Sequence, residues 1–426
     1  MIPSCTAYRS GVRVLAALTA LLLLALMPAA QAAGRATEIT WHGNQINLYD
    51  AQPVGRYGAG VTVAVLDGWV DGKHPDFEGR VLAGADCSSG TCVSGQPRDA
   101  CTHGTHVAGT VASSSFGVAT RAKVLPVRVL VDDGEGGCTG SSTDVAAGIR
   151  WATANGAQVM NLSLGGLVPG VSSSTDIPRA VAEAARAGVV VIFSAGNQQL
   201  PLADSYGNDA LVVAATGPSG RLASYSQFGQ GVDVAAPGGQ PSGANCSQAI
   251  CVTSLYPDRQ YAVAAGTSMA APHVSGLAAL LLAQQPSRTR TAVLDRIRST
   301  ARPLSGAGSG LVDARAALGA KAAAPRPTST ATRAPVVTQP TAKPKPAVTK
   351  RPVIKASPTA TKAPRPSPTS TTPTPSAAAA DTDPVDPPPL ATRVNRQPEE
   401  IPLPLTLLAA VLIAAGGMGT VVAYRR

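Results

Sequence analysis

Six short runs of mostly apolar, Val-rich residues recur between residues 61 and 238 of this 426-residue chain. They lack the strict alternation of apolar and polar residues that marks a half-exposed strand. Continuous apolar strands are typical of a parallel sheet that is covered on both faces. The runs are VTVAVLDG (61–68), AKVLPVRVL (122–130), QVMNLSLGG (158–166), VVVIFSAGN (189–197), ALVVAAT (210–216) and VDVAAPG (232–238).

Segments with helical character alternate with these runs. Residues 142–156 and 174–188 both open on Ser and Thr and close on a glycine, Gly156 and Gly188, which are ordinary helix start and stop signals. This alternation predicts an α/β fold, doubly wound, with a mainly parallel sheet and helices on both faces. In such folds active sites gather at the carboxyl ends of the strands.

Chemically competent residues stand at those positions. Asp67, Ser163 and Asn197 each follow a predicted strand, and His103 opens a helix of small residues. Ser268 lies at the entrance of an almost wholly apolar helical stretch. Together they supply a hydroxyl, a base, a carboxylate and an amide.

These four chemical groups have complementary roles in nucleophilic catalysis. A serine hydroxyl is a poor nucleophile until a base removes its proton, and imidazole has a suitable pKa near neutrality. A carboxylate on the other ring nitrogen fixes the tautomer and stabilises the imidazolium. A serine at a helix N-terminus places its own unpaired backbone N–H and the helix dipole at a developing oxyanion. The constellation predicts hydrolysis through Ser268, with Asn197 as second oxyanion donor.

Five motifs in this order resemble the subtilisin-like (subtilase) serine proteases. They are VAVLDGWVD, HGTHVAGT, NLSLGG, FSAGN and GTSMAAPHVSG, and the resemblance covers about residues 55–318. It implies a seven-stranded parallel sheet and peptide-bond hydrolysis through an acyl-enzyme. It also assigns Asp67, His103 and Ser268 to the Asp-His-Ser triad of the family, in the same chain order, and Asn197 to the oxyanion amide.

The same resemblance predicts the substrate-binding residues. Ser163, Leu164 and Gly165 match the strand that pairs with the substrate backbone. The pocket for the side chain before the scissile bond would be lined by Gly166, Ala195 and Gly196. No charged residue occurs among them, so we expect broad specificity with a preference for apolar side chains.

The chain departs from the family directly after Asp67. Members usually carry Ser or Thr and then Gly, whereas Gly68 and Trp69 stand here. The carboxylate therefore has one hydroxyl partner fewer, and Trp69 adds bulk near the substrate cleft. This departure supports an alternative reading, a catalytically weak subtilase-fold scaffold or an accessory protein of a secretion system.

Other polar residues have ordinary structural interpretations. His106 and His273 are expected to be packed or hydrogen-bonded helix residues rather than metal ligands. The acidic stretch 131–137 lacks the full EF-hand spacing and reads as a loop between strand and helix. We expect no required cofactor; the family resemblance leaves room for structural calcium, but the sequence identifies no ligand set.

Both ends of the chain are apolar. Residues 1–32 have a basic start, an apolar middle and an Ala-x-Ala ending, which predicts a secretory signal peptide rather than a core helix. Residues 405–424 carry no charge and are long enough to cross about 30 Å of hydrocarbon. Arg425 and Arg426 then favour a cytoplasmic tail. A transmembrane helix over 403–424 is predicted, with a buried helix of a soluble protein as the alternative.

Nineteen of the 36 prolines lie between residues 321 and 402, a segment of Pro, Thr, Ala, Ser and Lys that cannot bury a core. We interpret it as a disordered linker. The remaining boundaries follow: an N-terminal arm over 33–54 and a peptidase domain over 55–320. The arm is too short for an independent pro-domain, and we expect it to remain attached and to lie against the protease surface.

Charge separates along the chain. Residues 34–320 hold 19 basic and 20 acidic side chains, whereas residues 321–400 hold 12 and 5. The excess positive charge therefore belongs to the linker. The near-neutral globular part does not indicate nucleic-acid binding. The predicted partners are polypeptide substrates and, through the C-terminal helix, the cell membrane with the catalytic domain outside. Signal, protease, linker and anchor in this order resemble the mycosins, membrane-bound proteases of mycobacterial-type secretion systems.

Seven cysteines become six once the predicted signal and Cys5 are removed, and six in an exported domain indicate three disulfides among fifteen pairings. Two pairs are each five residues apart in Gly/Ser-rich loops, where local bridges are natural, which leaves one long-range pair. We therefore predict the bridges Cys87–Cys92, Cys246–Cys251 and Cys101–Cys138.

Overall fold

The structure, a computed structural model, describes residues 38–165 and 175–322 together with the backbone of 422–424. The predicted signal peptide lies outside the described residues. So do nearly all of the predicted linker and most of the predicted transmembrane segment.

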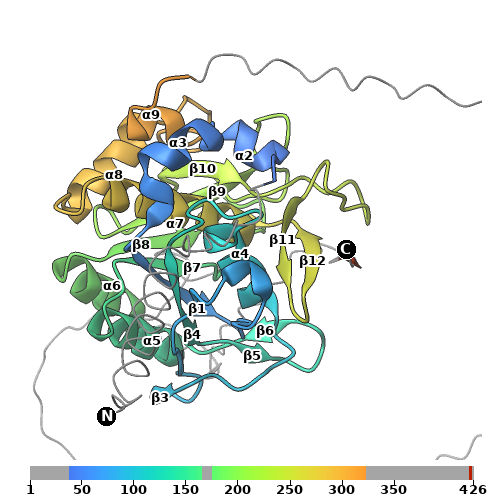
Figure 1. Ribbon diagram of the computed structural model, residues 1–426, viewed down its shortest axis with the longest axis vertical. Coiled ribbons are helices and arrows are strands. Elements are labelled where there is room, and N and C mark those ends of the chain that lie inside the picture. Colours follow the sequence, from blue (N-terminus) through green and yellow to red (C-terminus); the bar gives the residue numbers. More distant parts are fainter. Residues whose placement is uncertain (1–37, 166–174, 323–421, 425–426) are drawn as a thin grey trace, which may run out of the picture. The chain divides into compact units, whose positions relative to one another are not determined.

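A parallel sheet forms the centre of the described part (Figure 1). Seven of its eight strands run parallel, as the family resemblance implies, and the short β3 adds an antiparallel partner to β2 at one edge. Each of the six predicted runs contains one strand. In spatial order the strands are β10 (Val234–Pro237), β9 (Ala210–Thr216), β8 (Val190–Ser194), β7 (Val159–Leu162), β1 (Thr62–Asp67), β4 (Lys123–Arg128), β2 (Ala85–Asp86) and β3 (Val93–Ser94).

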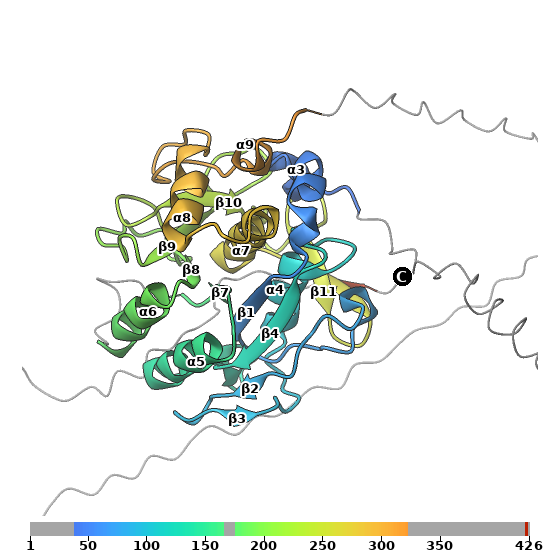
Figure 2. The ribbon, with the colours of Figure 1, turned by 60° about the vertical axis from the view of Figure 1, so that its left-hand side comes forward.

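Successive side chains of β1 point to opposite faces of the sheet, and both faces are buried. Val63 and Val65 belong to one apolar core, and Ala64 and Leu66 belong to the other. Figure 2 shows which helices cover each face. The first core is covered by α4 (His103–Ala112) and α7 (Thr267–Gln284), and the second by α5 (Ser142–Ala154) and α6 (Asp176–Arg186). The doubly wound prediction is confirmed.

The strand order reverses beside β1, because β4 pairs with one edge of this strand and β7 with the other. Ligand sites of open α/β sheets lie at such a switch point, outside the carboxyl ends of the strands. Asp67 is the last residue of β1. The topology alone thus places this carboxylate where a site is expected.

The helix α7 crosses the first core and is buried from Thr267 to Ala283. It is apolar on all sides, as a fully buried helix must be. A hairpin of β11 (Val252–Tyr256) and β12 (Gln260–Ala264) leads into it. The shorter α8 (Arg290–Ser299) and α9 (Ala314–Leu318) add Leu294 and Leu318 to the same core.

The N-terminal segment penetrates further than a surface arm would. It forms α2 (Trp41–Gln45), α3 (Leu48–Val54) and the turn η1 (Arg56–Gly58). The side chains of Ile46 and Leu48 are buried in the first core. The segment packs against the protease, as expected, and these two side chains reach its core. Its retention in the mature enzyme stays a prediction.

Three further short elements are η2 (Pro75–Phe77), β5 (Val131–Asp132) and β6 (Cys138–Thr139). The acidic stretch forms the turn between β5 and β6. There the Asp133 carboxylate accepts hydrogen bonds from the backbone N–H groups of Glu135 and Gly137. The stretch connects β4 with α5, as the loop interpretation expected, but its first two residues form β5 and the rest a hairpin turn.

Of the predicted transmembrane helix, only Val422–Tyr424 (β13) is described, and this piece is an extended strand paired antiparallel with β12. The strand replaces helix here because an edge strand such as β12 offers a row of backbone groups for pairing. Among the helices of the described ranges, none is both long and apolar enough to cross a bilayer. The rest of the anchor lies outside the described residues.

Candidate active site

The Asp67 carboxylate and the His103 imidazole are joined directly. His103 Nδ1 lies 2.8 Å from Asp67 Oδ1 and 3.0 Å from Oδ2. Asp67 is fully buried at the end of β1, and the His103 side chain, at the start of α4, is 18% exposed. The backbone N–H of Gly68 also donates to Asp67 Oδ1, at 2.7 Å. The carboxylate is therefore held from two sides, and one ring nitrogen of the imidazole is committed to it.

Two opposing effects set the pKa of His103. Burial alone would lower it, but the negative charge of Asp67 and the hydrogen bond to it outweigh burial, so the pKa is raised above the usual 6.5. An opposite charge at this distance favours the protonated ring. The arrangement stabilises an imidazolium and leaves the second ring nitrogen, Nε2, to exchange protons.

Ser268 is the second residue of α7, so its backbone N–H has no partner within the helix. The side chain is 7% exposed. Its hydroxyl donates to the backbone carbonyl of Ser163 at 3.2 Å, and the Ser163 hydroxyl donates to the Ser268 carbonyl at 2.8 Å. The two serines thus lock the end of β7 to the start of α7, and rotation of one side-chain torsion would redirect the Ser268 hydroxyl.

Asn197 follows β8 and is oriented by the residue before Ser268. Its Oδ1 accepts hydrogen bonds from both the backbone N–H and the hydroxyl of Thr267, each at 2.9 Å. This fixes the amide and leaves Nδ2 as the free donor end. A Cβ built on Gly266 would lie 3.4 Å from Asn197 Nδ2 and 3.7 Å from the Ser268 backbone nitrogen. Two N–H donors therefore flank one small space, which glycine keeps open.

The predicted substrate-binding residues lie close to these groups but differ in exposure. Leu164 is buried in the second core, and Gly165 has open space where a side chain would project. Ala195 is fully buried in the second core, and its backbone N–H donates to the Val213 carbonyl. The Gly196 N–H donates to the Thr267 hydroxyl at 3.0 Å. Gly166 lies outside the described residues.

The three predicted disulfides are present in the structure. Cys87–Cys92 and Cys246–Cys251 close local loops, and Cys101–Cys138 joins residues 37 apart in sequence. The long bridge connects the loop directly before His103 to β6.

Trp69 lies beneath a cation. The Arg98 guanidinium sits 5.1 Å from the centre of its indole ring, and Arg98 is paired with Asp258 at 2.8 Å. The indole is partly buried, and its backbone N–H donates to the Cys101 carbonyl at 2.9 Å. The Trp69 ring therefore packs against Arg98, which forms an exposed ion pair with Asp258.

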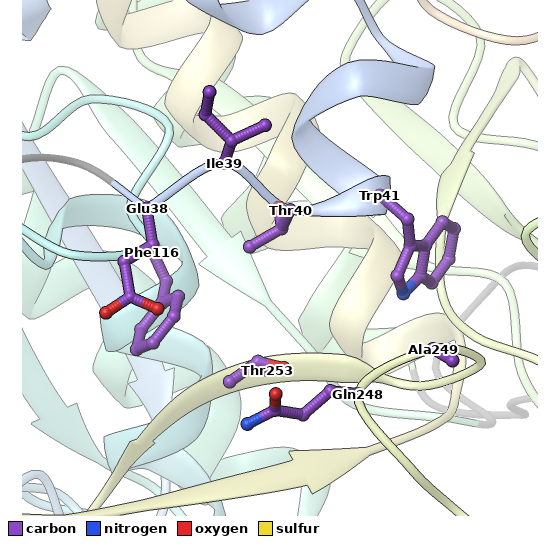
Figure 3. Close-up of a pocket in the computed structure, with 8 residues that line it drawn as sticks. All are labelled: Glu38, Ile39, Thr40, Trp41, Phe116, Gln248, Ala249 and Thr253. Atoms are coloured by element: carbon purple, nitrogen blue, oxygen red, sulfur yellow. The ribbon is translucent and has the colours of Figure 1, made fainter. Parts of the chain in front are cut away.

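A cavity of about 190 Å³ lies elsewhere, between the N-terminal segment and the β11 region (Figure 3). None of the candidate catalytic residues lines it. Its lining residues are Glu38, Ile39, Thr40, Trp41, Phe116, Gln248, Ala249 and Thr253.

Comparison with known proteins agrees with this geometry. Residues 58–328 match the model of the subtilase family of peptidases. The chain belongs to the subtilase family. Subtilisin BL of Lederbergia lenta is 37% identical over 295 residues, which are 66% of this chain and 99% of that protein. Thermitase of Thermoactinomyces vulgaris is 37% identical over 259 residues, 59% of this chain and 84% of that protein.

A solved structure described as MycP1 with the N-terminal propeptide removed is similar as well. It has a TM-score of 0.56 and 27% identity, and the match covers 66% of this chain and 97% of that one. These likenesses identify a serine endopeptidase of the subtilase family whose architecture is mycosin-like.

Sequence reasoning missed one group of residues in this subtilase. Asp99 accepts hydrogen bonds from the backbone N–H groups of Cys101 and Asp132, at 2.9 and 3.0 Å, and its other oxygen pairs with Arg128. Arg128 also pairs with Asp86 at 2.9 Å. This network fixes the loop before His103 to the edge of the sheet. Its members belong to no motif, and their only signal was the presence of an arginine inside a strand that should be apolar.

A second contact was also unforeseen. His42 Nδ1, on the N-terminal segment, lies 2.9 Å from His273 Nε2, inside the helix that carries Ser268. His273 Nδ1 lies 2.8 Å from the Met269 carbonyl, so it donates there, and Nε2 must then accept from His42. His273 and His106 are buried helix residues, as expected. The partner from 231 residues earlier carried no sequence signal.

Proposed function

We propose that this subtilase is a membrane-tethered extracellular endopeptidase that cleaves peptide bonds through an acyl-enzyme on Ser268. Two contacts carry the proposal: the Asp67–His103 pair at the end of β1 and the start of α4, and the Asn197 amide held beside the N-terminus of α7, a helix that packs against α4. A nucleophile, its base, the residue that orients the base and two oxyanion donors are the full set that acyl transfer requires.

Each group then has a defined role. His103 Nε2 takes the proton of the Ser268 hydroxyl as Oγ attacks the carbonyl carbon of the substrate. Asp67 keeps the proton of Nδ1 in place and stabilises the imidazolium. The tetrahedral oxyanion occupies the space beside Gly266 and accepts hydrogen bonds from the Ser268 N–H and from Asn197 Nδ2. His103 returns its proton to the leaving amine, and water releases the acyl group by the same route.

The substrate would lie in an extended conformation against residues 163–165. The open space beside the partly buried Gly165 leaves room for a second backbone, as strand addition requires. None of the residues assigned to binding the side chain before the cut is charged, which favours cleavage after apolar residues.

The alternative of a catalytically weak scaffold rested on Gly68 and Trp69. A side chain at position 68 would clash with Cys101, which gives this glycine a steric reason, and the Gly68 N–H donates to Asp67. The departure from the family pattern therefore does not favour loss of activity.

The tether and the location are proposed from the sequence. The apolar residues 403–424 followed by two arginines, the N-terminal 1–32 and three disulfides are together what an exported, anchored protein carries. Full-length protein should remain with the membrane after washing in high salt, whereas a chain ending at residue 320 should be released into the medium. Release of both chains would contradict the tether.

The test of catalysis is active-site labelling with a fluorophosphonate. Wild type should be labelled and should cleave a casein or peptide substrate, and Ser268→Ala should lose both. Ser287→Ala, which removes an exposed serine just after the same helix, is the matched control and should keep both. Label that persists in Ser268→Ala would contradict the assignment, and an unlabelled, inactive wild type would favour the scaffold.

A further inference from the structure

The residue after the catalytic aspartate has no room for a side chain. A Cβ built on Gly68 would lie 2.1 Å from Cys101 Sγ and 2.4 Å from the Cys101 carbonyl oxygen. Both distances are far below van der Waals contact. The space that a serine or threonine would use at position 68 is therefore filled by Cys101, and by the half of the disulfide that this residue contributes.

Cys101 is itself tightly fixed. Its sulfur is bonded to Cys138, its N–H donates to Asp99, and its carbonyl accepts the N–H of Trp69. The residue is 1% exposed. The turn after β1 therefore lies between two groups. The disulfide contacts it on one side, and on the other its Gly68 N–H donates to the Asp67 carboxylate.

The same turn supports the base. A Cβ on Gly104, the second residue of α4, would lie 2.5 Å from the Gly68 carbonyl oxygen, so the first turn of the helix that begins at His103 rests directly on Gly68. The turn at Gly68 therefore contacts both Asp67 and the first turn of the helix that carries His103, and Cys101 packs against this turn.

We infer that the Cys101–Cys138 disulfide is a positioning element for the Asp67–His103 pair: it takes the place of a side chain at position 68 and holds the Gly68 turn against Asp67. This inference rests on the proposed function and adds a role for a bridge that otherwise reads as a stabilising crosslink. Glycine at 68 and the disulfide then form a matched pair, and neither can be changed alone without moving the carboxylate.

The two cysteines are nearly fully buried, so reductant in solution would reach the bridge mainly in unfolded molecules. Substitution is the cleaner test. We would compare Cys101→Ala/Cys138→Ala, Gly68→Ser and the triple variant, each at a temperature where circular dichroism shows it folded. The matched control is Cys87→Ala/Cys92→Ala, because Cys87 is hydrogen-bonded to the Arg128 carbonyl instead of contacting Gly68.

The double cysteine variant should lose roughly tenfold to a hundredfold in kcat with little change in KM, since small displacements of a base carry such costs. Its acidic limb of kcat/KM should move to lower pH, because a displaced Asp67 raises the pKa of His103 less. Gly68→Ser alone should lose at least as much. In the triple variant the freed Cys101 loop can withdraw, and kcat should recover to above that of either parent variant.

A merely structural bridge would lower the melting temperature and leave kcat per folded molecule and the pH profile unchanged. That result, or full kcat in Gly68→Ser with the bridge intact, would overturn the inference. Neither outcome affects the proposed function, which fails only if wild type itself shows no Ser268-dependent cleavage. The Cys87/Cys92 control should keep the wild-type pH profile; a matching shift there would show that any lost bridge disturbs the site and would also overturn the inference.

Discussion

The two halves of the active site are held by different kinds of interaction. Asp67 and His103 are fixed by a disulfide, a network of carboxylates around Arg128 and backbone hydrogen bonds near the surface. Ser268 and Asn197 are fixed by a helix that is buried for nearly its whole length and by the amide's bonds to Thr267. Substitution of charged or disulfide-bonded side chains should therefore disturb the first half most, whereas changes in core packing or in the Asn197–Thr267 hydrogen bonds should disturb the second.

This contrast has a physical origin in the fold. The helix α7 passes between strands and other helices and finds apolar neighbours on every side. The loop before α4 is instead bonded to β5 and β6, short strands that bury little apolar surface of their own. Where packing is thin, a covalent bridge and ion pairs with low exposure supply the rigidity that a base needs.

The largest expected effect on kcat comes from a change in the half of the site that holds Asp67 and His103. Asp67→Asn keeps the size of the side chain but removes the charge and presents His103 with an amide, which selects the wrong tautomer. We expect kcat to fall by about 10⁴, the size of the loss that the same substitution causes in a chymotrypsin-type Ser-His-Asp triad. Steady-state kinetics on folded protein would measure it. Asp50→Asn, at a surface pair with Arg315, should leave kcat unchanged, and a loss below tenfold in Asp67→Asn would remove the pair from the mechanism.

Much of this site could be read from the sequence because its parts end strands or begin helices. Asp67 and Asn197 follow apolar runs, and His103 and Ser268 precede helical ones, so a parallel sheet brings them to one edge. The local bridges followed from their spacing, and the long bridge from elimination. These are short-range signals that survive without knowledge of packing.

The contacts that hold the site residues in place could not be predicted from such local signals. The fit of Gly68 against Cys101, the bonds that Asp99 makes and the contact of His42 with His273 all join residues from distant parts of the chain. Each depends on how closely two segments approach, which composition and periodicity do not encode. For the same reason the N-terminal segment was expected on the surface, although Ile46 is buried in the core.

The second prediction concerns the half of the site that holds Ser268 and Asn197. Asn197→Ala removes the Nδ2 donor and should lower kcat by about 10² to 10³ with KM nearly unchanged, the range known for this position in subtilisin. The variant also leaves the buried Thr267 N–H and hydroxyl without their acceptor, so its melting temperature should fall and kcat is measured at a temperature where it is folded. Asn208→Ala, which removes a surface amide bonded to Arg298, is the control. A rise in KM with kcat preserved would assign Asn197 to substrate binding instead.

The smallest expected effect separates His103 from the other buried histidines by the sign of the pH dependence that each gives to stability. Burial lowers the pKa of His106 to about 3 and that of His273 to about 4, with the charge of His103 adding to the first. Burial and the neighbouring His273 also lower the pKa of His42. Below the unfolded value of 6.5 the unfolded chain takes up these protons and the folded chain does not.

Stability should therefore fall as the pH drops from about 6.5 towards 4, by up to about 1.4 kcal/mol per pH unit for each such histidine. His103 acts in the opposite sense: its folded pKa is raised, so its contribution is complete below pH 6.5 and is lost as the pH rises through the folded value. Denaturant unfolding of Ser268→Ala, which avoids self-digestion, would measure both limbs. His42→Gln should flatten the acidic limb and leave the alkaline one in place, since His42 contacts His273 and not the Asp67–His103 pair. An unchanged acidic slope would show that the His42–His273 contact does not couple the N-terminal segment to the helix of Ser268.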